Sequence, residues 1–306
     1  MGRLRRSAGR FLRSTAHFQA SPPGSRLTVG RGASSPPTRR RPRGPAPGRR
    51  PRPVRRRGHL MTSSPLRARE LPDALPAIPG AVSRPPFVHF GPGPLADALA
   101  GVPEAEVTEF LGSWDDLPGD AHLGTEKPYR FRRYGKFRLR SRGLAPLPHA
   151  PFFQDASVNR VNGGVARLFA PLHPSVAAGE PLRRVVLALL DRLPGPRAGI
   201  DTCGVHQIRV VATVNAEGHP APEGVHRDGH CYVAQVLIRR QDVRGAESCL
   251  YDPERRPVHR AVLTAPLETI ILDDRRVLHG VSPVRPASGA ATGVRDMLLV
   301  DFLGGS

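Results

Sequence analysis

Lysine is almost absent from this chain of 306 residues, since 44 of its 46 basic residues are arginine. Acidic residues are absent from residues 1–60, which contain 17 arginines. Residues 61–306 carry 29 basic and 26 acidic side chains, a net charge of +3, against +20 for all 306 residues. The excess charge that would favour a polyanionic partner is therefore confined to the first 60 residues.

Cysteine and long apolar runs are also scarce. Cys203, Cys231 and Cys249 are odd in number and have no Cys-x-x-Cys spacing, which argues against a disulfide framework and a cysteine-based zinc site. No apolar run reaches the length of a membrane span, and no hydrophobic signal core is present. These features predict a cytoplasmic protein without a membrane partner.

Residues 1–60 are rich in Arg, Pro, Gly and Ser and lack an apolar period. Such a segment cannot bury enough surface to offset its ordering entropy, so we expect it to be disordered. It could be a basic tail for nucleic acid or a membrane surface, or a transit peptide. We favour a third interpretation, a non-functional extension such as an early start codon would produce, because Met61-Thr-Ser-Ser-Pro resembles an ordinary N-terminus. Residues 61–306 are then the functional domain.

Helical patterns precede strand patterns in this domain. Apolar residues recur among acidic and small residues in 94–113, which predicts one or two short helices, and 181–193 is the clearest helix. Residues 128–145 alternate Arg with aromatic or apolar residues, as a strand with one exposed face does. Further strands are predicted at 205–214, 232–238, 247–251, 258–263, 269–272 and 296–303. The series predicts a mainly β (α+β) fold, a barrel or jelly roll with helices before it.

Two histidines and one aspartate stand out within the strand region. His226 and Asp228 are two residues apart, which places both side chains on one face of a strand. His279 follows the apolar strand 269–272 and would come from a neighbouring strand. Two imidazoles and one carboxylate can hold iron(II) on one face and leave other positions open, although zinc accepts the same donors.

Two arginines follow His279 closely. If the electron donor of an iron oxygenase is 2-oxoglutarate, its distal carboxylate needs a cation, and arginine offers a bidentate fork. Arg295 opens the last predicted strand, which is a rigid mount, whereas Arg285 precedes Pro286 in a loop. We therefore expect Arg295 to bind the co-substrate.

The segments around these residues resemble one known family. They are similar to the bacterial 2-oxoglutarate/Fe(II) dioxygenases that include L-isoleucine 4-hydroxylase and related free amino-acid hydroxylases. The segments that carry the resemblance are 163–169, 205–209, Pro222-Glu-Gly-Val-His-Arg-Asp-Gly229, Gly245-Ala-Glu-Ser248, 250–252, 272–283 and 294–300. The chain departs from the family at Ala246, where a second glycine is common, and residues 1–60 have no counterpart.

The resemblance implies a double-stranded β-helix (jelly-roll, cupin-like) fold with N-terminal helices packed against it. It also implies Fe(2+) bound by His226, Asp228 and His279, with 2-oxoglutarate bound by the metal and Arg295. The implied reaction uses O2 to hydroxylate an unactivated C–H bond of a free L-amino acid and releases succinate and CO2.

Contacts to such a substrate need donors for its carboxylate and acceptors for its ammonium group. Gln207 and Arg209 share one face of a strand that could look into the barrel, and Glu223 lies near the metal motif. Arg130 and Arg132 are further options. Two alternatives stay open: the same chemistry on another small substrate or a peptide-bound residue, and a non-catalytic nucleic-acid-binding protein acting through the Arg-rich N-terminus.

Overall fold

A computed structural model describes residues 84–124, 128–141, 143–156 and 163–304. The disorder expected for residues 1–60, and the expected domain start at residue 61, fall outside this part of the chain. Within it, no helix is long and apolar enough to cross a membrane.

Short helices precede most of the strands, as the sequence predicts. The helical elements are α2 (Gly93–Leu99), α3 (Glu104–Gly112), η2 (Ser113–Asp116), η3 (Ala121–Leu123), α4 (Pro174–Ala177) and α5 (Glu180–Leu190). The early strands are β1 (Phe87–Phe90), β2 (Arg130–Arg140), β3 (Gly143–Pro146), β4 (Ala170–Pro171) and β5 (Ile200–Thr213). The later strands are β6 (Tyr232–Gln241), β7 (Val243–Gly245), β8 (Glu247–Tyr251), β9 (Pro257–Val262), β10 (Thr269–Asp273), β11 (Leu278–Val281), β12 (Val284–Pro286) and β13 (Thr292–Gly304).

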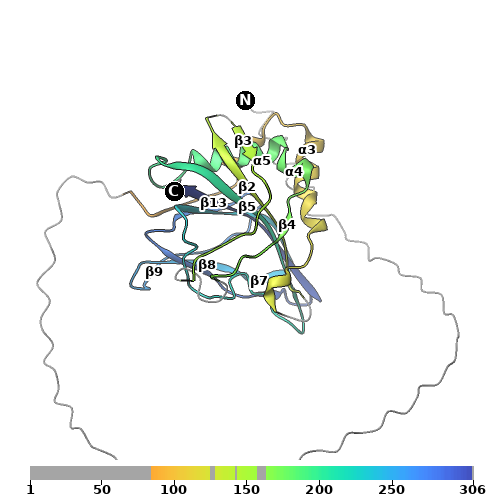
Figure 1. Cartoon of the computed structure of the whole chain (residues 1–306). Helices are drawn as coiled ribbons and strands as arrows, with labels where there is room; N and C mark the ends of the chain where they lie inside the picture. Colours follow the sequence, from red (N-terminus) through yellow and green to blue (C-terminus); the bar gives the residue numbers. More distant parts are fainter. Residues whose placement is uncertain (1–83, 125–127, 142, 157–162, 305–306) are drawn as a thin grey trace, which may run out of the picture. The chain divides into compact units, whose positions relative to one another are not determined.

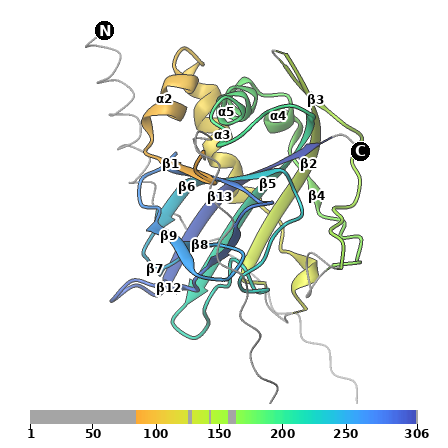
Figure 2. The same cartoon turned by 90° about the vertical axis from the view of Figure 1, so that its left-hand side faces the viewer.

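The strands form one large sheet and two small ones. The large sheet has the order β1-β10-β6-β13-β5-β2-β3, with β4 paired in parallel to β2 and the other pairs antiparallel. The small sheets have the orders β11-β8-β9 and β12-β7. Figures 1 and 2 show helices α3, α4 and α5 on one side of the large sheet and strands β7, β8 and β9 on the other. This is the mainly β, jelly-roll architecture with helices packed against it that the sequence predicts.

Alternate residues of the large sheet serve two cores. Leu298, Val300 and Phe302 of β13 are fully buried and pack in the cluster that contains α5. Met297 of the same strand belongs instead to the cluster shared with Leu250 of β8. Since successive side chains of a strand point to opposite faces, the large sheet is covered on both sides, and the second side is where a pocket can form.

The predicted helices and strands are found in the structure, but the two central strands are longer than predicted. Helix α5 lies where the 181–193 pattern indicates, and the 128–145 pattern is the β2–β3 hairpin. Strand β5 begins at Ile200 and β13 at Thr292, several residues before the predicted starts. The two strands pair with each other over almost their full length, so backbone hydrogen bonds extend them beyond the apolar alternation.

Candidate active site

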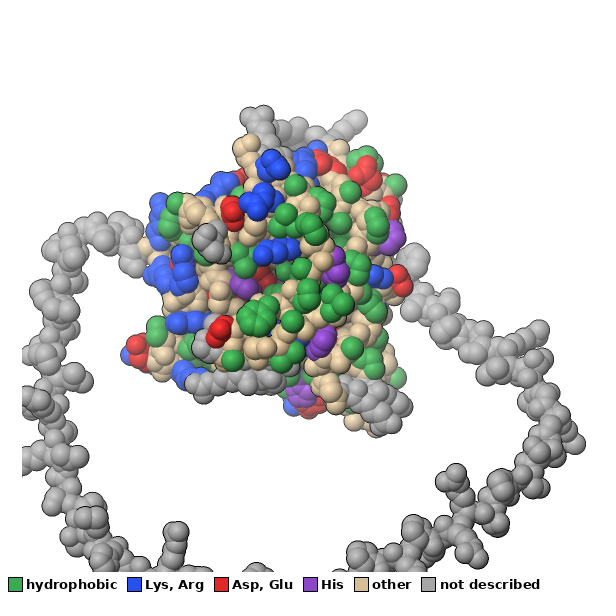
Figure 3. Space-filling view, in the orientation of Figure 1, with side chains coloured by type: hydrophobic (Ala, Val, Ile, Leu, Met, Phe, Trp, Pro, Cys, Tyr) green, Lys and Arg blue, Asp and Glu red, His purple; other side chains and the backbone are tan. Residues whose placement is uncertain are grey.

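A pocket lies between the large sheet and the β11-β8-β9 sheet. The large sheet supplies alternate residues of β2, β5 and β13 to its wall, and β11 supplies His279 and Val281. Loop residues, among them Phe152, Gln154 and Glu223, complete the lining. Histidine and acidic side chains gather near the middle of the face in Figure 3, with hydrophobic side chains beside them. The pocket therefore combines ionisable and apolar surface.

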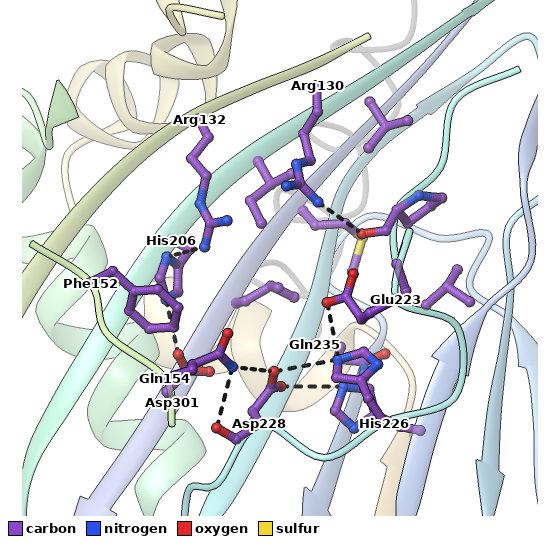
Figure 4. Close-up of a pocket in the computed structure, with 18 of the residues that line it drawn as sticks. Arg130, Arg132, Phe152, Gln154, His206, Glu223, His226, Asp228, Gln235 and Asp301 are labelled. Atoms are coloured by element: carbon purple, nitrogen blue, oxygen red, sulfur yellow. Dashed lines mark hydrogen bonds and ion pairs between the residues drawn. The ribbon is translucent and has the colours of Figure 1, made fainter. Parts of the chain in front are cut away.

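The structure brings His226, Asp228 and His279 together in this pocket. Each offers one ligand atom, and these atoms all lie within 4.8 Å of one another. Oδ1 of Asp228 is 3.4 Å from Nε2 of His226, and Oδ2 is 3.3 Å from Nε2 of His279 (Figure 4). Two imidazoles and a carboxylate that converge from one side fit an iron(II) ion with open positions.

Backbone contacts hold these three residues. His226 and Asp228 lie in a turn-rich loop and not on a regular strand as expected, but one β-bridge joins His226 to His279, with N···O distances of 2.9 and 2.8 Å. The buried Asp274 accepts hydrogen bonds of 2.7 to 3.1 Å from three consecutive backbone N–H groups that begin at Asp228. The loop is therefore fixed without a regular strand.

The electrostatics of this cluster suit a cation. Burial disfavours the charged form of His226, but Asp228 and Glu223 outweigh this effect and raise its pKa to about 9. Burial also disfavours ionised Asp228, yet His279 and His226 outweigh it, so the pKa of Asp228 lies well below its ordinary value. The carboxylate is thus held ionised, and a metal ion can take the place of the proton on His226.

Arg295 lies on the pocket face of β13 and is 3% exposed. Its Nε and Nη2 have no hydrogen-bond partner in the described part of the chain. Burial and the nearby Arg240 lower its pKa to about 10. A buried guanidinium without an anion is unfavourable, so the distal carboxylate of 2-oxoglutarate fits this position. Arg285, in contrast, is half exposed and paired with Glu217 at 2.5 Å.

Sequence reasoning missed Gln154, which contacts the triad, and Arg167, which contacts Gln154. Nε2 of Gln154 donates to Oδ1 of Asp228 at 3.0 Å (Figure 4). Oε1 of Gln154 accepts from Nη2 of Arg167 at 2.5 Å. Arg167 falls in the 163–169 segment that resembles the known family, which was the one available signal. No local pattern could link these residues to the metal motif, because Gln154 and Asp228 are 74 residues apart.

A second buried network extends from the same pocket, and of its residues sequence reasoning considered only Arg132. Arg132 contacts Nδ1 of His206 at 2.7 Å, and Nε2 of His206 lies 2.9 Å from Asp301. His230 lies 3.4 Å from the same carboxylate. Burial and Arg132 lower the pKa of His206 to about 4. His206 is therefore neutral near pH 7, with Nδ1 accepting from Arg132 and Nε2–H donating to Asp301.

The expectation for Gln207 and Arg209 needs correction, because their face of β5 does not look into the pocket. Nε2 of Gln207 donates to the Ser113 hydroxyl at 2.6 Å. Arg209 is paired with Asp296 and Asp115, both at 2.7 Å. The pocket receives the even-numbered residues of this strand instead.

Three other residues considered from the sequence do line the pocket. Oε1 of Glu223 is 3.4 Å from Nε2 of His226. Arg130 and Arg132 reach the pocket from β2, because they share one face of that strand.

Comparison with known proteins agrees with this arrangement. The family model described as 2OG-Fe dioxygenase matches residues 112–301. A 3(1)-hydroxy-L-isoleucine 4-dioxygenase of Pantoea ananatis (strain AJ13355) is 24% identical over 225 residues, which cover 70% of this chain and 90% of that protein.

Solved structures show the same fold. A BsmA homologue from Methylobium petroleophilum PM1 is 31% identical with a TM-score of 0.62, over 72% of this chain and 88% of that one. The structure of IDO from Bacillus thuringiensis is 19% identical with a TM-score of 0.58, over 72% and 95% of the two chains. The matched family region contains every residue that lines the pocket. The chain therefore belongs to the 2OG-Fe dioxygenase family and is a dioxygenase that uses Fe(2+), 2-oxoglutarate and O2.

Proposed function

We propose that this enzyme hydroxylates an unactivated C–H bond of a free L-amino acid. In this proposal His226, Asp228 and His279 hold the iron, and Arg295 holds the distal carboxylate of 2-oxoglutarate. The observation that carries the proposal is that one pocket contains both the three converging ligand atoms and the buried guanidinium of Arg295, whose Nε and Nη2 have no partner in the described residues.

The protein side chains have distinct tasks. Bound iron and 2-oxoglutarate supply an oxidant from O2, with succinate and CO2 as co-products. Asp228 stays ionised and faces both imidazoles, so the three donors are oriented before a metal binds. Arg295 fixes the far end of the co-substrate on a rigid strand, and the apolar side chains of Ile208 and Leu299 reduce access of water.

Two observations support a free amino acid as substrate. The pocket carries buried or half-buried charges of both signs, Arg132 and Arg167 on one hand and Glu223 on the other, which suits a small zwitterion. The Pantoea relative is named for a hydroxylated L-isoleucine, an amino acid with an aliphatic side chain.

The test is a substrate panel. The protein is incubated with Fe(II), 2-oxoglutarate, ascorbate and each of the common L-amino acids, and the products are weighed by mass spectrometry. We expect at least one amino acid to gain one oxygen atom with matched succinate release. Succinate formation without oxygen gain in any of them would retain the chemistry and reject the substrate class.

The matched variant is Asp228→Ala, which removes the ligand that both histidines face. We expect it to lose iron binding and turnover together, since two imidazoles alone bind iron(II) weakly. Turnover in this variant would contradict the metal assignment.

A further inference from the structure

We propose that Arg132 and Arg167 form a second anion site, separate from Arg295, that binds the α-carboxylate of the substrate. The inference deepens the proposed function and rests on it, because it assigns the residues that recognise the amino acid.

The first observation is positive charge without a counter-ion. Arg132 contacts the neutral His206, and Arg167 contacts the Gln154 amide, but neither forms an ion pair with a carboxylate in the described residues. The Nε atoms of both are buried and lack a hydrogen-bond partner among the residues that the structure describes. Both guanidinium groups line the pocket and are at most 8% exposed. Buried charges are ordinarily paired, so an anionic ligand is the partner that this pair lacks.

Arg130 shows the contrast on the same strand face. Its Nε forms a 2.9 Å ion pair with the buried Asp120, and its Nη1 donates to the Pro220 carbonyl. Its charge is therefore already compensated. It still adds to the positive field at the other two arginines. Burial is the main cause that lowers the pKa of Arg132 to about 9, and the charge of Arg130 is the second. The same two causes lower the pKa of Arg167.

Aromatic rings fix the two guanidinium planes. Cζ of Arg132 lies 4.0 Å from the ring centroid of Phe169, and Cζ of Arg167 lies 5.0 Å from that of Phe152. Such stacking holds each plane while its edge stays free to donate. The edge donors of an arginine match the two oxygens of a carboxylate, so both the charge and the geometry select this group.

Strand register separates this site from Arg295. The cross-strand rows are Arg295–Val210–Arg130 and Met297–Ile208–Arg132. Neighbouring strands are about 4.8 Å apart, so β13 and β2 are separated by about 10 Å. Apolar side chains of β5 stand between them, which keeps the co-substrate carboxylate and the substrate carboxylate on different cations.

The site is also connected to the metal ligands. Gln154 accepts from Arg167 and donates to Asp228, so one amide spans the distance between the anion site and the triad. A substrate that is held by its carboxylate at Arg167 would point its side chain toward His226, Asp228 and His279. Binding of the carboxylate at the arginines would therefore place a C–H bond of the substrate's side chain, and not the groups on its α-carbon, at the reacting centre.

The experiment measures binding apart from turnover. The holoprotein carries Mn(II) in place of Fe(II), with 2-oxoglutarate and without O2, and is titrated calorimetrically with L-amino acids and their α-carboxamides. We expect the tightest-binding amino acid to lose at least about tenfold in affinity as its carboxamide, which lacks the anionic group. In Arg167→Gln and Arg132→Gln we expect the acid to bind about a hundredfold more weakly and the amide to change less than about threefold.

Two controls separate recognition from folding. The dissociation constant of 2-oxoglutarate should stay unchanged in both variants, because Arg295 is on another strand. Arg138→Gln removes a half-exposed arginine of the same strand β2 and should change neither ligand, since surface ion pairs contribute little.

The outcomes distinguish the two proposals. Equal affinity for acid and amide, undiminished acid binding in both variants, or no binding by any amino acid would overturn the anion site. Arginine-dependent binding without oxygen gain would keep the site and reject the hydroxylation. Oxygen gain that proceeds equally well on the carboxamide would keep the hydroxylation and reject the anion site.

Discussion

A buried arginine such as Arg295 can have one of two roles: it can form a structural ion pair, or it can bind a ligand. Its burial and its two unpaired nitrogens favour ligand binding. We expect Arg295→Ala to weaken 2-oxoglutarate binding about a hundredfold, because a charge-assisted bidentate contact is lost. Equilibrium dialysis of the co-substrate checks this. Arg285→Ala is the matched control, and a loss of affinity there, with none in Arg295→Ala, would reverse the assignment.

His206 makes the stability of the fold depend on pH. Burial and Arg132 lower its pKa to about 4, whereas an unfolded histidine titrates near about 6.5. Between these values the unfolded protein binds a proton that the folded protein does not, so the free energy of unfolding falls as the pH falls. From pH 6.5 to 4.5 the loss from this one group is about 2 kcal/mol.

The variant His206→Gln isolates that contribution, because an amide can still donate to Asp301 and accept from Arg132. We expect its free energy of unfolding in urea to fall less steeply than that of the parent between pH 6.5 and 4.5. Parallel pH dependences would show that His206 is already protonated in the fold.

The gathering of the triad and Arg295 in one pocket could be predicted because each of these residues has a local signal. His226 and Asp228 are close in sequence, and His279 and Arg295 follow or begin apolar strands. Arg167 and Gln154 have no such signal. Gln154 contacts Asp228 from a loop 74 residues earlier and Arg167 contacts Gln154, so only the folded chain brings these residues together.

Strand β5 shows where sequence patterns stop being informative. Its pattern places it correctly, but it is buried on both faces, so hydrophobicity does not tell which face looks into the pocket. The error on Gln207 and Arg209 has this origin: both lie on the face toward η2, where they contact Ser113, Asp115 and Asp296 and not the pocket.

The short pair β7–β12 depends on one glycine. Gly245 has a φ of +74°, and a Cβ there would overlap the carbonyl oxygen of Pro283. Gly289 has a φ of +81°, but a Cβ there would stand in open space. Gly289→Ala should therefore cost about 1 kcal/mol of stability from the left-handed backbone alone. Gly245→Ala should cost about 2 kcal/mol more, because the backbone of the strand pair must move.

Urea unfolding of the two alanine variants gives that difference directly. Equal losses would mean that the β7–β12 pair adjusts without cost. The comparison also bears on Ala246, which follows at a φ of +57° where the related family commonly has glycine.

Charge is divided unevenly along the sequence, and the catalytic pocket lies in the nearly neutral portion. The residues that line the pocket fall between 130 and 301, whereas 17 of the 46 basic residues precede residue 61. The charge distribution therefore argues against a polyanion-binding role for residues 61–306, whereas the dioxygenase prediction rests on the triad and the family resemblance. The sequence could not define the substrate, because the pocket is lined by side chains from β2, β5, β6, β11, β13 and the loops between strands.

Removal of residues 1–60 tests this division. We expect the shortened protein to keep the same succinate production and the same unfolding temperature, because the contacts of the pocket come from residues 130–301. Any affinity for a polyanion such as double-stranded DNA should fall sharply and lose its salt dependence, since the net charge drops from +20 to +3. The readouts are a coupled succinate assay, thermal unfolding and DNA binding at two salt concentrations. Loss of turnover on removal of the segment would show that it contributes to the catalytic domain and would contradict its description as a functionless extension.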